Sequence, residues 1–235
     1  MESKELTAVK RRNEGLMTMH PSFDTTTKER PMKASALALT ALALAFGSAS
    51  AARAADTSPW VFRVGVHTVN PKSNNGTLAG MKATIDSDTK PTFSLEYMFD
   101  RNWGVDVLAA LPFKHTVRLN GVSAATTKHL PPTVGVNYHF MPDATVSPFV
   151  GVGLNYTRFF ETRGVGPLQG AHVSIANSFG AAAHAGLDLR INDRWLATAD
   201  VRWMSIAGDV KVNGTKVGKA NIDPLAYGLS IGYRF

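Results

Sequence analysis

The chain has 235 residues, no cysteine and a formal net charge of +7 at pH 7. The lack of cysteine excludes a disulfide scaffold and any thiolate metal site. Residues 55–235 hold 17 basic and 13 acidic side chains, a balance of +4 without a Lys/Arg cluster, which argues against a nucleic-acid partner. The length fits one domain plus removable sequence.

The first 54 residues resemble export sequence rather than part of a fold. An apolar run from Ala34 to Phe46 is followed by two small-residue A-x-A motifs within Ala49 to Ala54. The run is too short to cross a bilayer as a helix and is typical of a secretory signal peptide. We predict three segments: an upstream extension over 1–31 outside the fold, a signal peptide over 32–54, and a folded domain over 55–235. Whether translation starts at Met1 or Met32 stays open.

Eight segments of the folded domain alternate apolar with polar or small side chains, the period-two pattern of strands with one apolar face. They cover residues 60–69, 92–99, 103–111, 132–140, 149–159, 179–191, 195–204 and 225–235. Three short turns alternate with four long polar segments, which we expect to be loops: 71–90, 114–128, 161–177 and 205–221. We also expect a helical turn within 78–85 and a hairpin tip at Asn213-Gly214.

The final segment, Leu225 to Phe235, keeps its apolar face to the last residue, which is unusual for a chain end in water. Alternating short turns and long loops, strands of membrane-crossing length and aromatic strand ends are typical of outer-membrane barrels. We therefore predict an all-β fold, an eight-stranded antiparallel transmembrane β-barrel with both termini in the periplasm. The alternative is a soluble lipocalin-type barrel, whose apolar face points inward; the Gly-rich polar face with balanced charges favours the membrane barrel.

The inward positions divide by height into two groups. Near the periplasm and the middle we expect a structural plug of paired charges, formed by Arg63, Glu96, Asp106, Asp188, Arg190, Asp200, Arg202 and Arg234. Nearer the long loops we expect an apolar lining suited to a small hydrophobic ligand, formed by Val69, Leu108, Ala110, Pro131, Phe159 and Met204.

A plugged lower lumen would force a bound molecule to leave sideways, between strands, into the bilayer. Pro112 and Pro131-Pro132 lack ladder donors near the strand tops and could weaken the wall there. The alternative is that these prolines only end their strands.

No catalytic residue, metal site or cofactor is predicted. His115, His129 and His172 lie in the expected loops near Ser174 and Ser205 without a catalytic spacing, so we expect solvated surface histidines. The inward histidines, His67, His139 and His184, lie at different heights and form a poor metal site. Phosphate-loop and dinucleotide-binding motifs are absent.

Several motifs occur in the same order as in one known family. They are LAALPFKH at Leu108 to His115, HLPP at His129 to Pro132, PFVGVGLNYT at Pro148 to Thr157 with Phe159-Phe160 after it, and NDRW at Asn192 to Trp195. Over residues 57–235 the chain resembles the outer membrane protein W (OmpW) family. The resemblance implies a barrel with a hydrophobic channel for small apolar compounds, and roles in stress adaptation and in recognition by a bacteriocin or host.

The chain end, Tyr233-Arg234-Phe235, resembles the carboxy-terminal signal read by the outer-membrane assembly machinery. Expected partners are therefore this machinery, outer-membrane lipid and a small hydrophobic ligand, with the oligomeric state open. Two functions stay in competition: binding or passage of hydrophobic molecules through the upper lumen, and a structural or interaction role of the four extracellular loops in stress, receptor binding or host contact.

Overall fold

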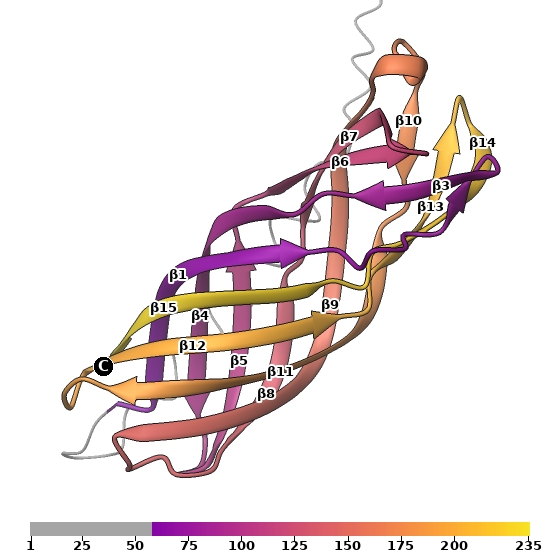
Figure 1. The fold of residues 1–235 in the computed structure, drawn as a ribbon. Coiled ribbons are helices and arrows are strands. Elements are labelled where there is room, and N and C mark those ends of the chain that lie inside the picture. The colour runs from indigo at the N-terminus through magenta and orange to yellow at the C-terminus, as the bar shows by residue number, and fades with distance from the viewer. Residues whose placement is uncertain (1–57) are drawn as a thin grey trace, which may run out of the picture. The chain divides into compact units, whose positions relative to one another are not determined.

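The computed structural model describes residues 58–235, so the segments predicted over 1–31 and 32–54 lie outside the described residues. This part of the chain consists almost wholly of strands (Figure 1), and none of its helices is long and apolar enough to span a membrane. The elements are β1 Trp60–Asn70, β2 Thr77–Leu78, β3 Met81–Ile85, β4 Asp88–Met98, β5 Trp103–Ala110, β6 Phe113–Leu119, β7 Val122–Leu130, β8 Thr133–His139, β9 Val146–Gly164, the 3-10 helix η1 Gly166–Leu168, β10 Val173–Ile175, β11 Ser178–Arg190, β12 Trp195–Met204, β13 Ala207–Val212, β14 Thr215–Asn221 and β15 Leu225–Arg234.

Eight strands close into one antiparallel barrel in the order β1, β4, β5, β8, β9, β11, β12, β15. The ring closes where β15 pairs with β1, from Arg234 opposite Val61 to Leu225 opposite Asn70. Closure supplies partners for backbone groups that lipid could not satisfy. The predicted fold class, eight antiparallel strands in a closed barrel, is thereby confirmed.

The outer face of the barrel is apolar and the inner face is polar. Outward side chains such as Phe179, Val152 and Leu229 are 70%, 67% and 65% exposed, whereas Arg63 and Glu96 inside are buried. A soluble barrel would have the opposite arrangement. This distribution fits a barrel surrounded by lipid.

Aromatic pairs mark the end of the barrel that carries the chain's carboxy terminus. Ring centroids of Trp60 and Tyr97 lie 4.7 Å apart, those of Trp103 and Tyr138 4.8 Å. Trp195 and Tyr233 continue the row at 5.0 Å. Such a girdle is typical of the membrane–water interface.

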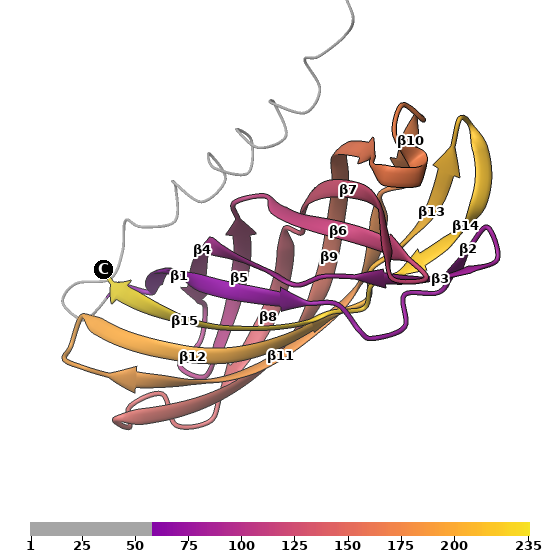
Figure 2. The same cartoon turned by 45° about the horizontal axis from the view of Figure 1, so that its top comes forward.

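The four long segments are not loops, contrary to the sequence-based expectation. With the end of β9, the strands β2, β3, β6, β7, β10, β13 and β14 extend the same sheet beyond the barrel, at the end opposite the carboxy terminus (Figure 1 and Figure 2); this part is here named the upper extension. The extension has a buried apolar cluster of its own, made of Leu78, Ala83, Val117, Ala125, Val173, Val210 and Ala220. It is therefore a folded continuation of the barrel wall.

Two local predictions on these segments have opposite outcomes. The helical turn expected within 78–85 is wrong: β2 and β3 form a hairpin that turns at Ala79 and Gly80, whose φ angles are 49° and 78°. The hairpin tip at Asn213-Gly214 is confirmed, since β13 pairs with β14 around it and both φ angles are positive, 50° and 84°. Positive φ at both central residues is the signature of a type I′ turn.

Deleting Phe235 should impair assembly of the barrel. Phe235 donates its backbone N–H to the Trp60 carbonyl at 3.2 Å and packs on Tyr233 with ring centroids 5.3 Å apart, at the strand pair that closes the barrel. We expect the yield of heat-modifiable barrel in outer-membrane fractions to fall severalfold. Phe140→Ala, another exposed aromatic residue but outside the closing pair, is the control; a normal yield without Phe235 would contradict this role.

Candidate functional site: the barrel lumen

The lower lumen is filled by an ion-pair network around Arg63. Its guanidinium donates to Glu96 at 2.7 Å and to Asp188 at 3.0 Å. Thr198 bridges the pair, accepting from Arg63 Nε and donating to Asp188. Because buried charges are tolerated only when paired and hydrogen-bonded, this network is a stable obstacle across the barrel.

A second network lies one step higher around Arg202. Arg202 Nε donates to Asp200 at 2.6 Å, and its Nη1 lies 3.5 Å from Asp106. His67 on β1 also belongs to this network: its Nε2 lies 3.0 Å from Asp200 and its Nδ1 2.7 Å from Thr92 Oγ1. An ionised carboxylate can only accept hydrogen bonds, so the imidazole Nε2 is the donor toward Asp200.

Histidines are part of these networks, which the sequence interpretation did not foresee. His139 Nε2 lies 2.9 Å from Glu96, which also accepts from Asn137 at 2.7 Å. His184 in turn contacts Asn137 at 2.7 Å. The signal for them in the sequence is their inward position on β1, β8 and β11.

Two arginines of the expected plug are not brought into these ion pairs. Arg190 is half-buried and donates to the Asp143 carbonyl at 3.0 Å, in the neighbouring turn. Arg234 is also half-buried, close to the barrel rim. Arg190 lies at a strand end, where its guanidinium reaches the carbonyls of the neighbouring turn. The remaining expected residues lie together in the lower lumen: Arg63, Glu96, Asp106, Asp188, Asp200 and Arg202.

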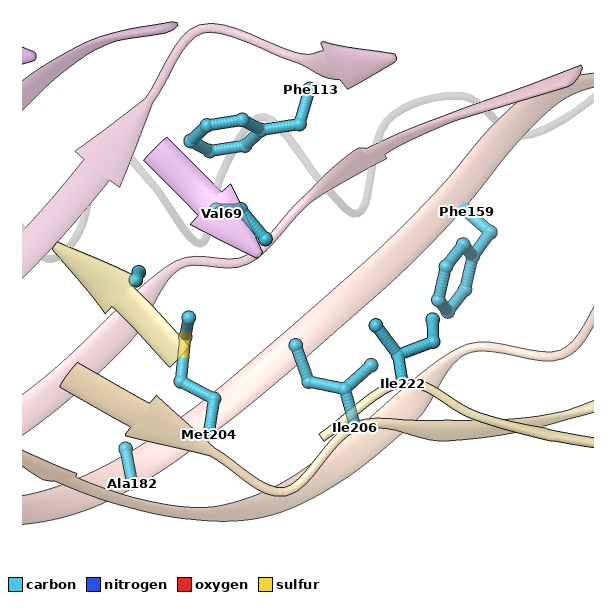
Figure 3. Packing of buried hydrophobic residues seen from close by; sticks show 8 residues of the cluster. Val69, Phe113, Phe159, Ala182, Met204, Ile206 and Ile222 are labelled. Atoms are coloured by element: carbon cyan, nitrogen blue, oxygen red, sulfur yellow. The ribbon is translucent and has the colours of Figure 1, made fainter. Parts of the chain in front are cut away.

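Above the charges the lumen becomes apolar. A cavity there is lined by Val69, Leu108, Ala110, Phe113, Pro131, Met204 and Ala226, with His67, Thr92 and Arg202 also on its wall. Phe159, expected in the lining, belongs instead to the buried cluster that surrounds it, with Ile206 and Ile222 (Figure 3). The side chains leave room for about one water molecule, so a larger ligand requires them to move.

The hydrogen-bonded ladder of the wall is interrupted beside this cavity. β5 pairs with β8 only up to Leu108 opposite Thr133, and β6 and β7 pair again from Phe113 opposite His129. The residues between, here named the proline seam, are 109–112 and 130–132. Since Ala110 and Pro131 also line the cavity, the seam separates the cavity from the outside of the barrel.

The seam has one fixed edge. Pro112, Pro131 and Pro132 lack the N–H needed for a ladder bond. The buried amide of Asn155 on β9 donates to the carbonyls of Pro131 at 3.0 Å and Pro132 at 3.2 Å. The proline pair is thus held to β9, while the described strands make no comparable bond across the seam to residues 109–112.

His115 and His129 stack above the cavity, and the expectation that they are solvated is wrong. They are 2% and 0% exposed, with ring centroids 4.8 Å apart and planes 8° from parallel. Phe113 and Phe159 lie on either side of His129, at 5.6 and 5.7 Å. Hairpin β6–β7 turns this face inward, and its opposite face carries Lys and Thr side chains, outside the lipid.

The surroundings keep both imidazoles neutral. Burial, together with the neighbouring His115, lowers the pKa of His129 from its ordinary value of 6.5 to about 3. Burial also lowers the pKa of His115, whose Nδ1 donates to the Asp86 carbonyl at 2.6 Å. Both ring nitrogens of His129 lack a hydrogen-bond partner among the described residues, so nothing compensates a positive charge there.

Comparison with known proteins identifies this barrel. A family model described as the OmpW family matches residues 46–235. The chain belongs to the OmpW family. Its sequence is 35% identical over 212 residues to outer membrane protein W of Escherichia coli K12, covering 85% of this chain and 99% of the relative. The resemblance seen in the motifs is confirmed, and this OmpW-family chain is an outer-membrane β-barrel protein of a Gram-negative cell.

Two further proteins extend the comparison. The crystal structure of the outer membrane protein OprG from Pseudomonas aeruginosa superposes with a TM-score of 0.67 and 32% identity, covering 76% of this chain and 97% of that one. The dibenzothiophene metabolism operon protein PahQ of Pseudomonas aeruginosa is 27% identical over 194 residues, 77% of this chain and 90% of the relative.

The histidine stack predicts a loss of stability at acidic pH. As the pH falls from 6.5 toward 3, histidine in the unfolded chain gains a proton that folded His129 does not, so the free energy of unfolding decreases. At pH 5 the loss is on the order of 2 kcal/mol for this one residue. Urea unfolding in lipid vesicles at pH 7.5 and 5 measures it.

His129→Leu should reduce this loss, because the buried ring no longer titrates. His172→Leu, at an exposed position, is the matched control and should behave as the unchanged protein. An acid loss of equal size in all three proteins would show that the stack is not its source.

Proposed function

We propose that this OmpW-family barrel takes up small hydrophobic molecules, which bind in the upper lumen and leave through the proline seam into the outer membrane. The observation that carries the proposal is the position of the apolar cavity directly against the interrupted part of the wall. A solute in the cavity is separated from lipid by Ala110, Pro131 and their neighbours rather than by a continuous ladder.

The charge networks favour this sideways route. An apolar solute moving straight down would have to separate Arg202 from Asp200 and Arg63 from Glu96. Breaking a buried ion pair costs about 3–5 kcal/mol, and the solute offers no replacement bonds. The lateral path crosses no charged side chain of these networks.

Met204 and Phe113 are the side chains whose movement would enlarge the cavity. Met204 is 2% exposed and Phe113 1%, and both line the cavity. Methionine adapts its shape easily, so its rotation admits a ligand at low cost. The name of the similar protein PahQ, from a dibenzothiophene metabolism operon, supports an apolar compound as cargo.

We also propose that the chain is not an enzyme. The histidines nearest in type to a general base, His115 and His129, are stacked on each other and on Phe113 rather than placed beside a serine. Their low pKa also makes them weak bases at neutral pH.

Charged side chains in the cavity should block uptake. Leu108→Asp with Met204→Asp places carboxylates where an apolar solute must bind, so uptake should fall about tenfold or more. Transfer of a fluorescent apolar solute into vesicles holding the folded barrel measures the effect. Leu108→Ala with Met204→Ala is the matched control and should retain uptake; unchanged uptake in the Asp variant would refute a route through the lumen.

Restoring backbone donors in the seam should separate binding from exit. Pro131→Val with Pro132→Val supplies two N–H groups with which the wall can close, so transfer into lipid should slow while solute still binds in the lumen. Pro148→Val, far from the seam on β9, is the control. An equal rate of transfer into lipid in both variants would contradict lateral exit, while ligand binding in the lumen would still stand.

A second candidate function is an interaction role of the upper extension. Its own buried cluster, separate from the one around the cavity, gives the extension a fixed surface. A surface phenotype lost on removal of the β13–β14 hairpin, with lumen variants silent, would favour that role over uptake.

A further inference from the structure

Charge is distributed unevenly between the two ends of the protein. Within residues 58–235, the segments 71–90, 111–130, 157–177 and 205–224 hold 11 basic and 5 acidic side chains, a balance of +6. The remaining described residues hold 6 basic and 7 acidic ones, a balance of −1. The positive charge thus belongs to the upper extension and its connections.

Four of these cations gather on the outer face of three neighbouring strands. β6, β7 and β9 pair so that Lys114 lies opposite Lys128, Lys128 opposite Phe160, and Leu130 opposite Arg158. Arg163 follows, opposite Thr126. We name this surface the basic patch; it consists of Lys114, Lys128, Arg158 and Arg163, with Leu130 and Phe160 between them.

The charge of the patch is poorly compensated by the protein. Like charges directly opposite each other in a strand pair are destabilising, as in the pair Lys114 and Lys128. Glu161 bonds Lys128 at 2.7 Å, and Asp88 pairs with Lys90 at 2.9 Å. Within residues 58–235, Arg158 forms no ion pair, and the patch holds four cations for one paired carboxylate.

The patch begins where the lipid-facing band ends. Arg158 follows the exposed, outward Tyr156 by two residues on the same face of β9, a rise of about 7 Å. Below it the outward residues of β9 are Leu154 and Val152, both exposed on the apolar outer face of the barrel. The cations therefore lie at the height of lipid headgroups.

We propose that the basic patch binds the phosphorylated headgroup of lipopolysaccharide, the glycolipid that forms the outer leaflet of this membrane. Lys and Arg side chains bind phosphate by charge-assisted hydrogen bonds, and Leu130 and Tyr156 offer apolar surface to an acyl chain below. A bound anion relieves the repulsion between Lys114 and Lys128.

The site adjoins the proline seam, although it does not depend on uptake. Lys114 follows Pro112 by two residues, and Leu130 immediately precedes Pro131. A lipid held here would therefore lie at the upper end of the seam and anchor hairpin β6–β7 at the membrane surface.

Binding to the purified barrel in detergent tests the site. Lipopolysaccharide, dephosphorylated lipopolysaccharide, phosphatidylglycerol and inorganic phosphate are titrated in turn, without divalent cations. We expect tight binding of phosphorylated lipopolysaccharide alone. Lys114→Gln with Lys128→Gln should raise its Kd about tenfold or more, because two charge-assisted hydrogen bonds to phosphate are lost.

Lys211→Gln with Lys219→Gln makes the same charge change on hairpin β13–β14, where both lysines are exposed, and should leave the Kd unchanged. Arg158→Gln with Arg163→Gln serves if the lysine variant does not fold, which heat-modifiable migration shows. Equal weakening by the control, or equal binding of dephosphorylated lipid, phosphatidylglycerol or free phosphate, would overturn the proposal.

Discussion

The structure depends on satisfying every backbone hydrogen-bonding group in a solvent that offers no partners. In hydrocarbon each unpaired N–H or C=O costs several kcal/mol, so the sheet must close, and β15 pairs with β1 along ten residues to do so. The proline seam is tolerated because proline has no N–H to lose and because Asn155, Thr133 and the Tyr156 N–H donate to the proline carbonyls. The closed barrel and the interrupted ladder at the proline seam thus both follow from the need to satisfy backbone hydrogen-bonding groups.

Closing eight strands also determines what the interior can hold. The barrel is narrow enough for side chains to fill, and they do so in two chemically different layers. Arg63 and Arg202 organise the lower layers through carboxylates and histidines, whereas Met204 and its neighbours form an apolar layer above. The lumen therefore has a charged lower part and an apolar part above it.

The period-two pattern predicted the barrel strands because each has one face in lipid over a full crossing. The upper extension was missed because its strands are short and carry no apolar outer face: Val117 and Ala125 face a small core, while Lys and Thr side chains point outward. Its histidines were misplaced for the same reason. The charged lumen residues followed from alternation, but Arg190 did not, since the reach of a side chain at a strand end is invisible in sequence.

The donors around Pro131 and Pro132 make the two edges of the seam unequal. Their carbonyls accept hydrogen bonds from the Asn155 amide, the Thr133 hydroxyl and the Tyr156 N–H. The pair links β7 to β8, both of which are paired with β9. On the other edge of the seam, the Leu111 N–H donates to the Pro91 carbonyl of β4 at 3.0 Å. The edge formed by the proline pair is thus hydrogen-bonded from both β8 and β9, whereas the edge at Leu111 is bonded only to β4 among the described strands.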